Sequence, residues 1–294
     1  LEEIVTENQP LAPFTWFKVG GPAEYFVRPR TEEELKAVIL RCRDHAIPWR
    51  VLGYGANLLV DDRGVRGVVI KLDEDGFGAL EFREGNITYA GAGTSLSRLV
   101  LESVRQGLGG AEALAGIPGS IGGAVTVNAG GRYGEIGTVV NRVCVVDHEG
   151  NAYWREKPEL VFDYRETNIS DQVVVGAEFT LMPDDPQRLL AKMREVWIIK
   201  KSTQPLSVRS AGCIFKNPAK DKPAGALIDK AGLKKTAIGR ARVSEQHANF
   251  IIADDGATFS DITRLIELVR EKIRDKYGID LELEVEVWRH DEAV

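Results

Sequence analysis

The sequence lacks the features that would place it in a membrane, on nucleic acid or in a disulfide-stabilised fold. No apolar stretch reaches transmembrane length, and the first residues have neither the basic nor the apolar region of a signal peptide. No long basic run occurs, and the net charge is −6. The three cysteines are far apart, so they predict neither a disulfide framework nor a metal site. We therefore expect an acidic, soluble, cytoplasmic protein without nucleic-acid or membrane partners.

Glycine, in contrast, is abundant and unevenly distributed. Ten of the thirty glycines lie between Gly109 and Gly137. Glycine loses more backbone freedom on folding than any other residue, so this density favours a loop whose backbone approaches a ligand. Apolar anchors such as Ile117 and Ile121 argue against a flexible linker. A concave surface of bare N–H groups suits a phosphate-bearing ligand. Tight packing of turns without a ligand is the alternative.

A second glycine motif, Gly53-x-Gly55-x-Asn57, follows an expected strand over residues 49–52. The dinucleotide-binding fingerprint would require a third glycine that opens a helix, with an acidic residue about twenty positions later. Residues 58–62 instead continue as strand and turn. Alone, this motif could be an ordinary turn. Together, the two glycine loops could close on one pyrophosphate.

The order of the expected elements indicates an α+β protein with mostly short strands and helices on one side. A capping box from Thr31 to Glu34 precedes an apolar helical pattern, and this helix joins strands at 23–27 and 49–52 in a β-α-β unit. The remaining expected strands are 68–72, 87–90, 142–146, 173–181, 248–253 and 281–287. The remaining expected helices are 95–106, 187–199, 224–231 and an amphipathic helix containing 262–273.

Six segments, spread from the first dozen residues to the last dozen, carry a resemblance to one family. They are residues 8–23, 53–59, 115–124, 162–165, 211–218 and 283–285. In this order they resemble the UDP-N-acetylenolpyruvoylglucosamine reductases (UDP-N-acetylmuramate dehydrogenases) of bacterial peptidoglycan synthesis.

The resemblance implies a two-subdomain FAD-binding fold of the vanillyl-alcohol-oxidase/para-cresol-methylhydroxylase (PCMH) type and a C-terminal α+β substrate-binding domain. We expect subdomain 1 over residues 1–75, subdomain 2 with the glycine-rich loops over 76–200, and the C-terminal domain over 201–294. No histidine occurs among the glycine loops, so we expect non-covalent FAD. The expected FAD-binding residues are Gly53, Tyr54, Gly55, Ala56, Asn57, Leu58, Gly116, Ile117, Pro118, Gly119, Ser120, Gly122, Gly123, Asn128, Ala129 and Gly130.

The implied activity is an oxidoreductase step in cell-wall synthesis, and thus in cell shape and division. NADPH, as co-substrate, reduces FAD. The flavin N5 then gives a hydride to the enolpyruvyl methylene carbon of UDP-N-acetylglucosamine enolpyruvate, and UDP-N-acetylmuramate results. The neighbouring carbon must receive a proton. Protein groups are therefore needed to stabilise developing negative charge, donate that proton and orient the substrate carboxylate.

Three residues match the catalytic positions that the resemblance implies. Arg165 suits a carboxylate or enolate because its guanidinium is planar and permanently charged, although a surface pairing with Asp163 or Glu166 is the alternative. Glu284 shares one face of the expected terminal strand with two other glutamates. That face is expected to be solvated, but the resemblance implies a buried Glu284 with a raised pKa.

Cys213 departs from the family pattern, in which a serine donates the proton. A thiol is far more acidic than an alkyl hydroxyl and can perform the same step, so we expect Cys213 to be the donor. The alternative is a buried, inert cysteine beside Ile214 and Phe215.

Four further residues match substrate-binding positions: Tyr164, Lys201, Asn217 and Gln246. Lys201 lies twelve residues before Cys213 and suits a phosphate, but Lys200 and Lys201 could equally form a solvated helix end. No inserted loop with a substrate-capping tyrosine is evident between Arg165 and Lys201, so the chain resembles the shorter subgroup of the family. We expect a monomer.

Three other functions remain open at this stage. One is another oxidase or dehydrogenase of the same flavin fold, and one is a non-catalytic nucleotide-sugar-binding protein. The third is a thiol hydrolase with Cys213 as nucleophile and His247 as base.

Overall fold

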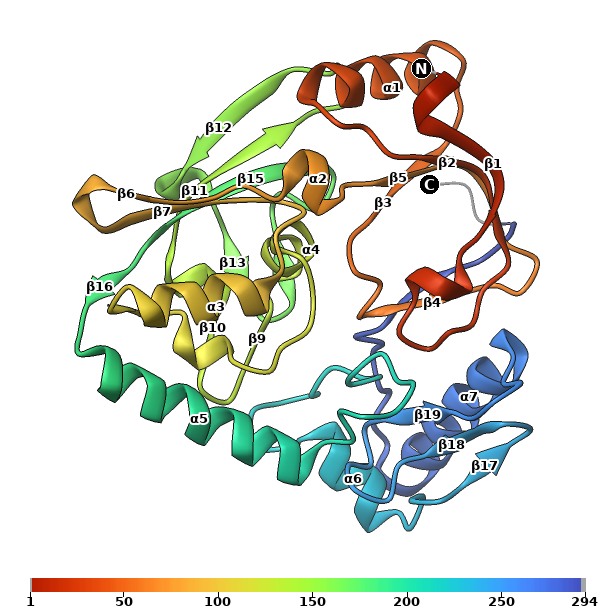
Figure 1. The fold of residues 1–294 in the computed structure, drawn as a ribbon. Coiled ribbons are helices and arrows are strands. Elements are labelled where there is room, and N and C mark those ends of the chain that lie inside the picture. The colour runs from red at the N-terminus through yellow and green to blue at the C-terminus, as the bar shows by residue number, and fades with distance from the viewer. Residues whose placement is uncertain (1, 292–294) are drawn as a thin grey trace.

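The first of three main β-sheets gathers strands from the N-terminal quarter of the chain (Figure 1). The computed structural model describes residues 2–291. The sheet order is β1 (Val5–Pro10), β2 (Pro22–Val27), β5 (Val65–Lys71) and β3 (Trp49–Leu52). Both β2 and β3 pair in parallel with β5, and α1 (Glu32–Asp44) connects them. The predicted β-α-β unit is therefore confirmed.

The start of α1 corrects one detail of the sequence prediction. Thr31 accepts the Glu34 N–H at 3.2 Å, as an N-cap should. The Glu34 carboxylate does not return this bond to Thr31. It accepts the Arg30 N–H at 2.7 Å and pairs with the Arg30 guanidinium at 2.7 Å. The predicted capping box is therefore wrong in its second half, because a charged neighbour offers the carboxylate a stronger partner.

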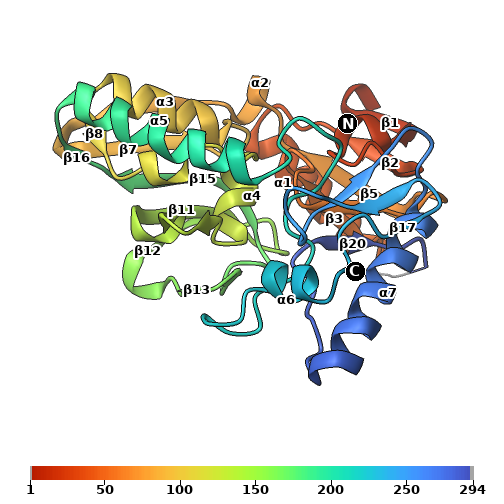
Figure 2. The same cartoon turned by 90° about the horizontal axis from the view of Figure 1, so that it is seen from below.

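The second sheet is wholly antiparallel and contains five strands. Their order is β12 (Ala152–Glu156), β11 (Val140–Val146), β15 (Val173–Thr180), β7 (Ile87–Gly91) and β6 (Leu80–Arg83). The helices of this region are α2 (Glu74–Phe77), α3 (Leu96–Arg105), α4 (Ile121–Thr126) and α5 (Pro186–Thr203). Figures 1 and 2 show α3 and α5 side by side on one side of the sheet.

The third sheet belongs to the C-terminal part of the chain. It comprises β17 (Ala237–Ile238), β18 (Ala241–Val243) and β19 (Ile251–Ala253), and it packs against α7 (Phe259–Tyr277). The helix α6 (Ala224–Lys230) contacts α7. The expected strand over 248–253 is shorter than predicted, because Asn249 uses its backbone and side chain to bind the segment around Phe215.

The last described strand returns to the N-terminal part of the molecule. β20 (Glu286–Trp288) pairs in parallel with β4 (Leu58–Val60), directly after the first glycine loop. The predicted strand over 281–287 is therefore wrong in its extent, since regular pairing covers only β20 and a single bridge joins Leu283 to Phe215.

Short elements complete the fold. The two-residue strands are β8 (Leu108–Gly109) with β16 (Met182–Pro183), β9 (Gly130–Gly131) with β10 (Gly134–Glu135), and β13 (Phe162–Asp163) with β14 (Glu166–Thr167). The 3₁₀ turns are Glu2–Ile4, Ala12–Phe14, Glu84–Asn86, Glu112–Leu114, Ile136–Thr138 and Lys157–Glu159.

The hydrophobic cores cross the expected domain boundaries. Val173 and Val175 of the second sheet pack with Val68 and Ile70 of the first. Leu59 packs with the C-terminal core around α7. These shared cores join the three expected domains, and the domain boundaries at residues 75 and 200 stay predictions. Within residues 2–291, no helix has both the length and the apolar character needed to cross a bilayer.

Candidate active site

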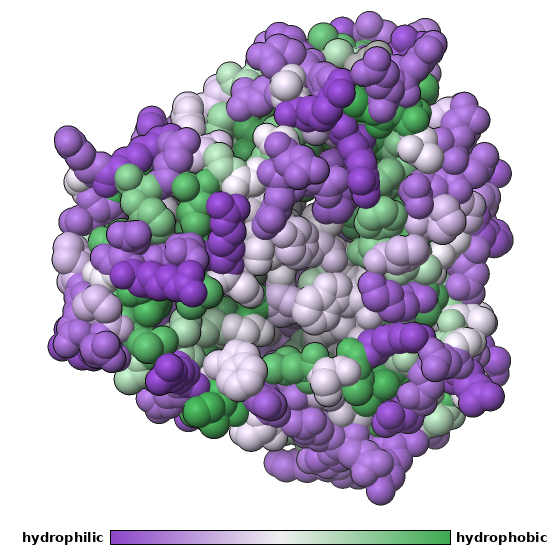
Figure 3. All heavy atoms as spheres, in the orientation of Figure 1, coloured by the Kyte–Doolittle hydropathy of each residue, from purple (hydrophilic) through white to green (hydrophobic). Residues whose placement is uncertain are grey.

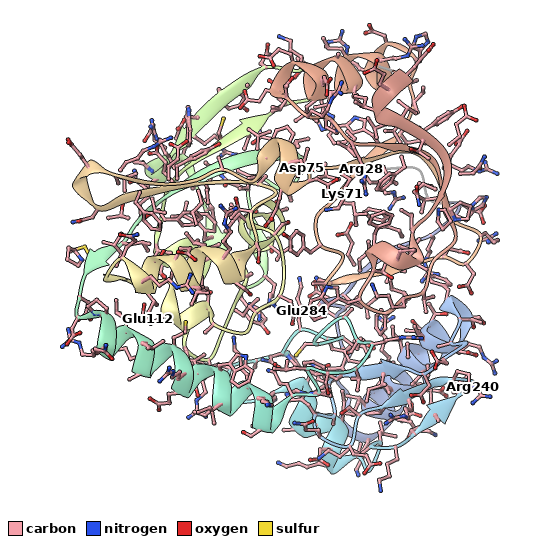
Figure 4. The ribbon with its side chains drawn as sticks, viewed as in Figure 1. Arg28, Lys71, Asp75, Glu112, Arg240 and Glu284 are labelled. Carbon is pink, nitrogen blue, oxygen red and sulfur yellow. The ribbon has the colours of Figure 1, made fainter. Side chains whose placement is uncertain are left out.

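A cavity of about 690 Å³ lies where the three parts of the chain meet. Both glycine loops line it, together with Arg165, Cys213 and Glu284. Figure 3, drawn in the orientation of Figure 1, shows a hollow near the centre of the molecule, surrounded by residues of intermediate hydropathy. Figure 4 labels Glu284 near the middle of the same view, between the two upper units and the C-terminal part. The cavity therefore collects residues from five of the six segments that carried the resemblance; residues 8–23 do not line it.

The first glycine loop begins where β3 ends and leads into β4. Gly55 has φ +60°, and a Cβ there would lie 2.1 Å from the Phe14 carbonyl oxygen, so glycine is required. Asn57 fixes the end of the loop: its Nδ2 donates to the Glu284 carbonyl at 2.9 Å, and its carbonyl accepts the Glu286 N–H at 3.0 Å. The loop and the Glu284 segment are thus one hydrogen-bonded unit.

The second glycine loop faces the first across the cavity wall. Ser120 caps α4 by accepting the Gly123 N–H at 3.4 Å. A Cβ on Gly53 would lie 2.7 Å from Ser120 Oγ, so the two loops are too close at this point for a side chain on residue 53. At Gly119, which has φ +146°, a Cβ would meet nothing within 4 Å. The loops form a cradle with bare backbone on both sides.

Arg165 and Glu284 form an ion pair in this cavity. Arg165 Nε donates to Glu284 Oε1 at 2.5 Å, and Arg165 Nη2 donates to the Gly130 carbonyl at 2.9 Å. Their side chains are only 17% and 15% exposed. Arg165 has φ +60° in the turn between β13 and β14, so the backbone is held in the left-handed region. The surface pairing of Arg165 with Asp163 or Glu166 is therefore wrong.

Burial raises the pKa of Glu284 above its ordinary value, although Arg165 opposes this effect. For Arg165, burial lowers the pKa, but Glu284 outweighs it and the net pKa is raised. In this pair the permanent cation of Arg165 can stabilise negative charge, and the buried Glu284 carboxyl can hold a proton.

A break in strand alternation turns Glu284 inward. The N–H groups of Glu284 and Val285 both donate to the Ile214 carbonyl, at 2.8 and 3.3 Å. Two consecutive donors on one acceptor interrupt the two-residue period, as in a β-bulge. Glu284 therefore leaves the face it would share with Glu282, whose side chain is 72% exposed.

Cys213 lines the same cavity and pairs with Phe250 through a β-bridge. Burial, and then the nearby Glu284 carboxylate, raise the pKa of the Cys213 thiol to about 12. The group is therefore a protonated thiol at neutral pH. The His247 ring accepts the Asn249 N–H at 3.3 Å and packs against Phe250. None of its described contacts reaches Cys213, which leaves a thiol hydrolase without its base.

Comparison with known proteins identifies the family. Residues 204–288 match the C-terminal domain of UDP-N-acetylenolpyruvoylglucosamine reductase, and residues 23–154 match an FAD-binding domain. The reductase of Bacillus pumilus is 38% identical over 96% of this chain and 93% of its own length. The reductase of Heliobacterium modesticaldum is 41% identical over 96% of this chain and 90% of its own. The chain belongs to the UDP-N-acetylenolpyruvoylglucosamine reductase family.

A solved structure agrees with this assignment. The reductase from Thermus caldophilus superposes with a TM-score of 0.84 at 38% identity, covering 97% of this chain and 98% of that one. The predicted α+β flavoprotein fold is confirmed, and the chain is an oxidoreductase of an FAD-dependent family.

FAD, the cofactor of this reductase family, fits the cavity. All residues expected to bind it line the cavity except Gly116 and Asn128. The Asn128 side chain instead forms hydrogen bonds within the protein: its Nδ2 donates to the Asp163 carbonyl at 2.9 Å, and its Oδ1 accepts the Gly137 N–H at 3.1 Å. Its contribution is to anchor the turn that carries Arg165.

None of the four residues expected to bind the reductase substrate is part of the cavity lining. The Tyr164 hydroxyl accepts the Asn217 N–H at 3.2 Å, which links the Arg165 turn to the C-terminal part. The Lys201 ammonium lies 4.9 Å from the Trp197 ring centroid, and the Lys201 carbonyl accepts Gln246 Nε2 at 3.1 Å. Their roles stay predictions.

Sequence reasoning missed a buried lysine beside the second glycine loop. Lys200 is 8% exposed, and its Nζ donates to the Ala115 carbonyl at 2.7 Å, directly before Gly116. Burial, and then Arg165, lower the pKa of Lys200 to about 8. Lys200 directly precedes the predicted Lys201 in the sequence. One step along a helix turns the side chain by about 100°, so the two lysines point in different directions.

Proposed function

We propose that this protein reduces the enolpyruvyl group of UDP-N-acetylglucosamine enolpyruvate to give UDP-N-acetylmuramate, with NADPH as electron source. The observation that carries the proposal is the Arg165–Glu284 pair facing the same cavity as Cys213 and both glycine loops. Bound FAD supplies hydride transfer, which none of the protein side chains can perform.

Arg165 binds and orients the substrate carboxylate in this proposal. Its Nε and Nη2 atoms already contact two oxygens, those of Glu284 and Gly130, so the guanidinium is held in place before substrate arrives. As hydride adds to the methylene carbon, negative charge develops on the neighbouring carbon and carboxylate. A fixed cation in a buried site stabilises that charge without reorganising.

Cys213 donates a proton to the substrate carbon next to the methylene carbon that receives the hydride. The S–H bond breaks, the C–H bond forms, and the thiolate regains a proton from solvent. A thiol with a pKa of about 12 is protonated at neutral pH, and its thiolate is basic enough to recover the proton readily. Glu284, whose pKa is raised, hydrogen-bonds to the enol form of the intermediate.

Lys201 and Gln246 bind the nucleotide sugar, with Tyr164 and Asn217 closing the side next to the Arg165 turn. We further propose that residues 1–75 and 76–200 are the two FAD-binding subdomains and that residues 201–294 form the substrate-binding domain. The protein acts as a cytoplasmic monomer in cell-wall synthesis. These assignments rest on the family resemblance and on the contacts described above.

The test begins with the purified protein, which should be yellow from tightly bound oxidised flavin. Under anaerobic conditions NADPH should bleach it, and the enolpyruvyl nucleotide sugar should restore the colour. Bleaching without recovery would support a flavin dehydrogenase of another specificity. A protein that binds the nucleotide sugar but is not reduced by NADPH would be a binding module.

A further inference from the structure

The Glu74 carboxylate lies outside the cavity and joins the first glycine loop to the segment that supports the second. Its Oε1 atom accepts the Tyr54 hydroxyl at 3.0 Å and the Ser95 N–H at 3.2 Å. Tyr54 belongs to the first loop and lines the cavity. Ser95 immediately precedes α3 in the second part of the chain. One oxygen atom thus contacts both the first loop and the segment that supports the second loop.

Ser95 belongs to the segment on which the second loop rests. It pairs with Ser120 through a β-bridge, and the Leu96 N–H donates to the Gly119 carbonyl at 3.0 Å. The Ile121 N–H donates to the Thr94 carbonyl at 2.8 Å. A shift of Ser95 would therefore move the backbone of the second loop with it.

The Tyr54 ring is supported by a second group of charges. The Lys71 ammonium lies 5.3 Å from its centroid and pairs with Asp73 at 3.2 Å, while Arg28 pairs with Asp73 at 3.3 Å. Figure 4 labels Arg28, Lys71 and Asp75 close together beside α2. Burial, and then Glu74, raise the pKa of Tyr54 to about 12, so its hydroxyl stays a donor.

We propose that Glu74 is a positioning residue for FAD. Through Tyr54 and Ser95 it fixes the distance between the two glycine loops, and this preorganisation slows release of the cofactor. The inference rests on the proposed function in taking FAD as the ligand. Glu74 itself is absent from the cavity lining, so its effect reaches FAD through the loops.

The experiment measures FAD release after dilution of the holoenzyme, followed by the fluorescence of free flavin. We expect Tyr54→Phe to accelerate release by about 5- to 10-fold, which corresponds to one hydrogen bond. Glu74→Leu should accelerate release at least as much, because it also removes the acceptor of the Ser95 N–H. The double variant should release FAD less rapidly than the product of the two single effects predicts, because both changes remove the bond between Tyr54 and Glu74. Glu74→Gln, which keeps an acceptor oxygen, should stay within about 2-fold of the wild type.

Asp75→Asn is the matched control. Asp75 is the exposed neighbour of Glu74 on α2, and the change removes the same charge. Asp75→Asn should leave both the rate of FAD release and turnover at saturating FAD unchanged. Wild-type release rates in Glu74→Leu and Tyr54→Phe, or effects that multiply in the double variant, would overturn the proposal. A wild-type protein without flavin would overturn the proposed function as well.

Discussion

Arg165 Nε lies 2.5 Å from Glu284 Oε1 although 119 residues separate them in sequence. The guanidinium therefore already holds a carboxylate, and in the proposed mechanism it also binds the substrate carboxylate. Substrate binding must displace Glu284 or share the cation with it. In either case Glu284 loses part of its partner while remaining buried, which favours its protonated form.

Replacing either member of this pair should disable the chemical step. We expect Arg165→Met and Glu284→Gln each to lower kcat/KM by about 10²- to 10³-fold, because each removes a preorganised contact to developing charge. Groups that act as a unit give non-additive losses. Steady-state kinetics on the double variant should show about the loss of the worse single variant. Losses that multiply would indicate two independent roles.

Substitutions at Cys213 separate a proton donor from an inert core residue. Cys213→Ala should slow reoxidation of the flavin by substrate by about 10²- to 10⁴-fold, whereas flavin reduction by NADPH should keep its rate. Cys213→Ser should retain most of the activity, since a hydroxyl can donate at the same position. Stopped-flow measurement of flavin absorbance gives the rates of flavin reduction and flavin reoxidation separately. An undiminished rate in Cys213→Ala would show that another group donates the proton.

The buried Lys200 should make stability depend on pH. Its pKa is about 8 in the folded protein and 10.5 in the unfolded chain, so the unfolded state binds more protons between these values and stability rises with pH. Lys200→Met removes this titration. The stability of the variant relative to wild type should therefore decline by about 3 kcal/mol from pH 7 to pH 10.5.

Urea unfolding of Lys200→Met at both pH values measures this difference. Lys192→Met, on the same helix, is the control because its side chain is 50% exposed. A constant stability difference for Lys200→Met across the range would contradict the prediction.

Gly55 should tolerate no side chain. A Cβ there would lie 2.1 Å from the Phe14 carbonyl oxygen, and the backbone has φ +60°. Gly55→Ala should lower the free energy of unfolding by about 2 to 3 kcal/mol and weaken FAD binding. Gly131→Ala is the comparison, because a Cβ at that position meets nothing within 4 Å and the change should be nearly neutral. Chemical denaturation of both variants with and without FAD tests the contrast.

Much of this architecture could be predicted from local patterns. Helical periodicity predicted α1, α3 and α7, and the two glycine loops predicted the cradle at which the parts meet. The inward turn of Glu284 could not be obtained from alternation, which groups it with Glu282 and Glu286. It depends on two N–H groups sharing the Ile214 carbonyl, a contact between segments seventy positions apart.

The contacts behind the cradle were equally inaccessible to sequence patterns. Glu74 is one acidic residue among many, and only the fold brings Tyr54 and Ser95 to the same oxygen. Lys200 differs from Lys201 by one position in a helix, and the tertiary packing of α5 decides which of them is buried.

The pairing of β20 with β4 has a consequence for the order in which the protein matures. Asn57 and Glu284 are 227 positions apart, so the ribosome completes both glycine loops long before it makes the residues that brace the first. Domains generally form from the N-terminus during synthesis. The nascent chain therefore contains both glycine loops while it still lacks Glu284, the acid that we propose acts there, and the cavity is complete only when β20 pairs with β4.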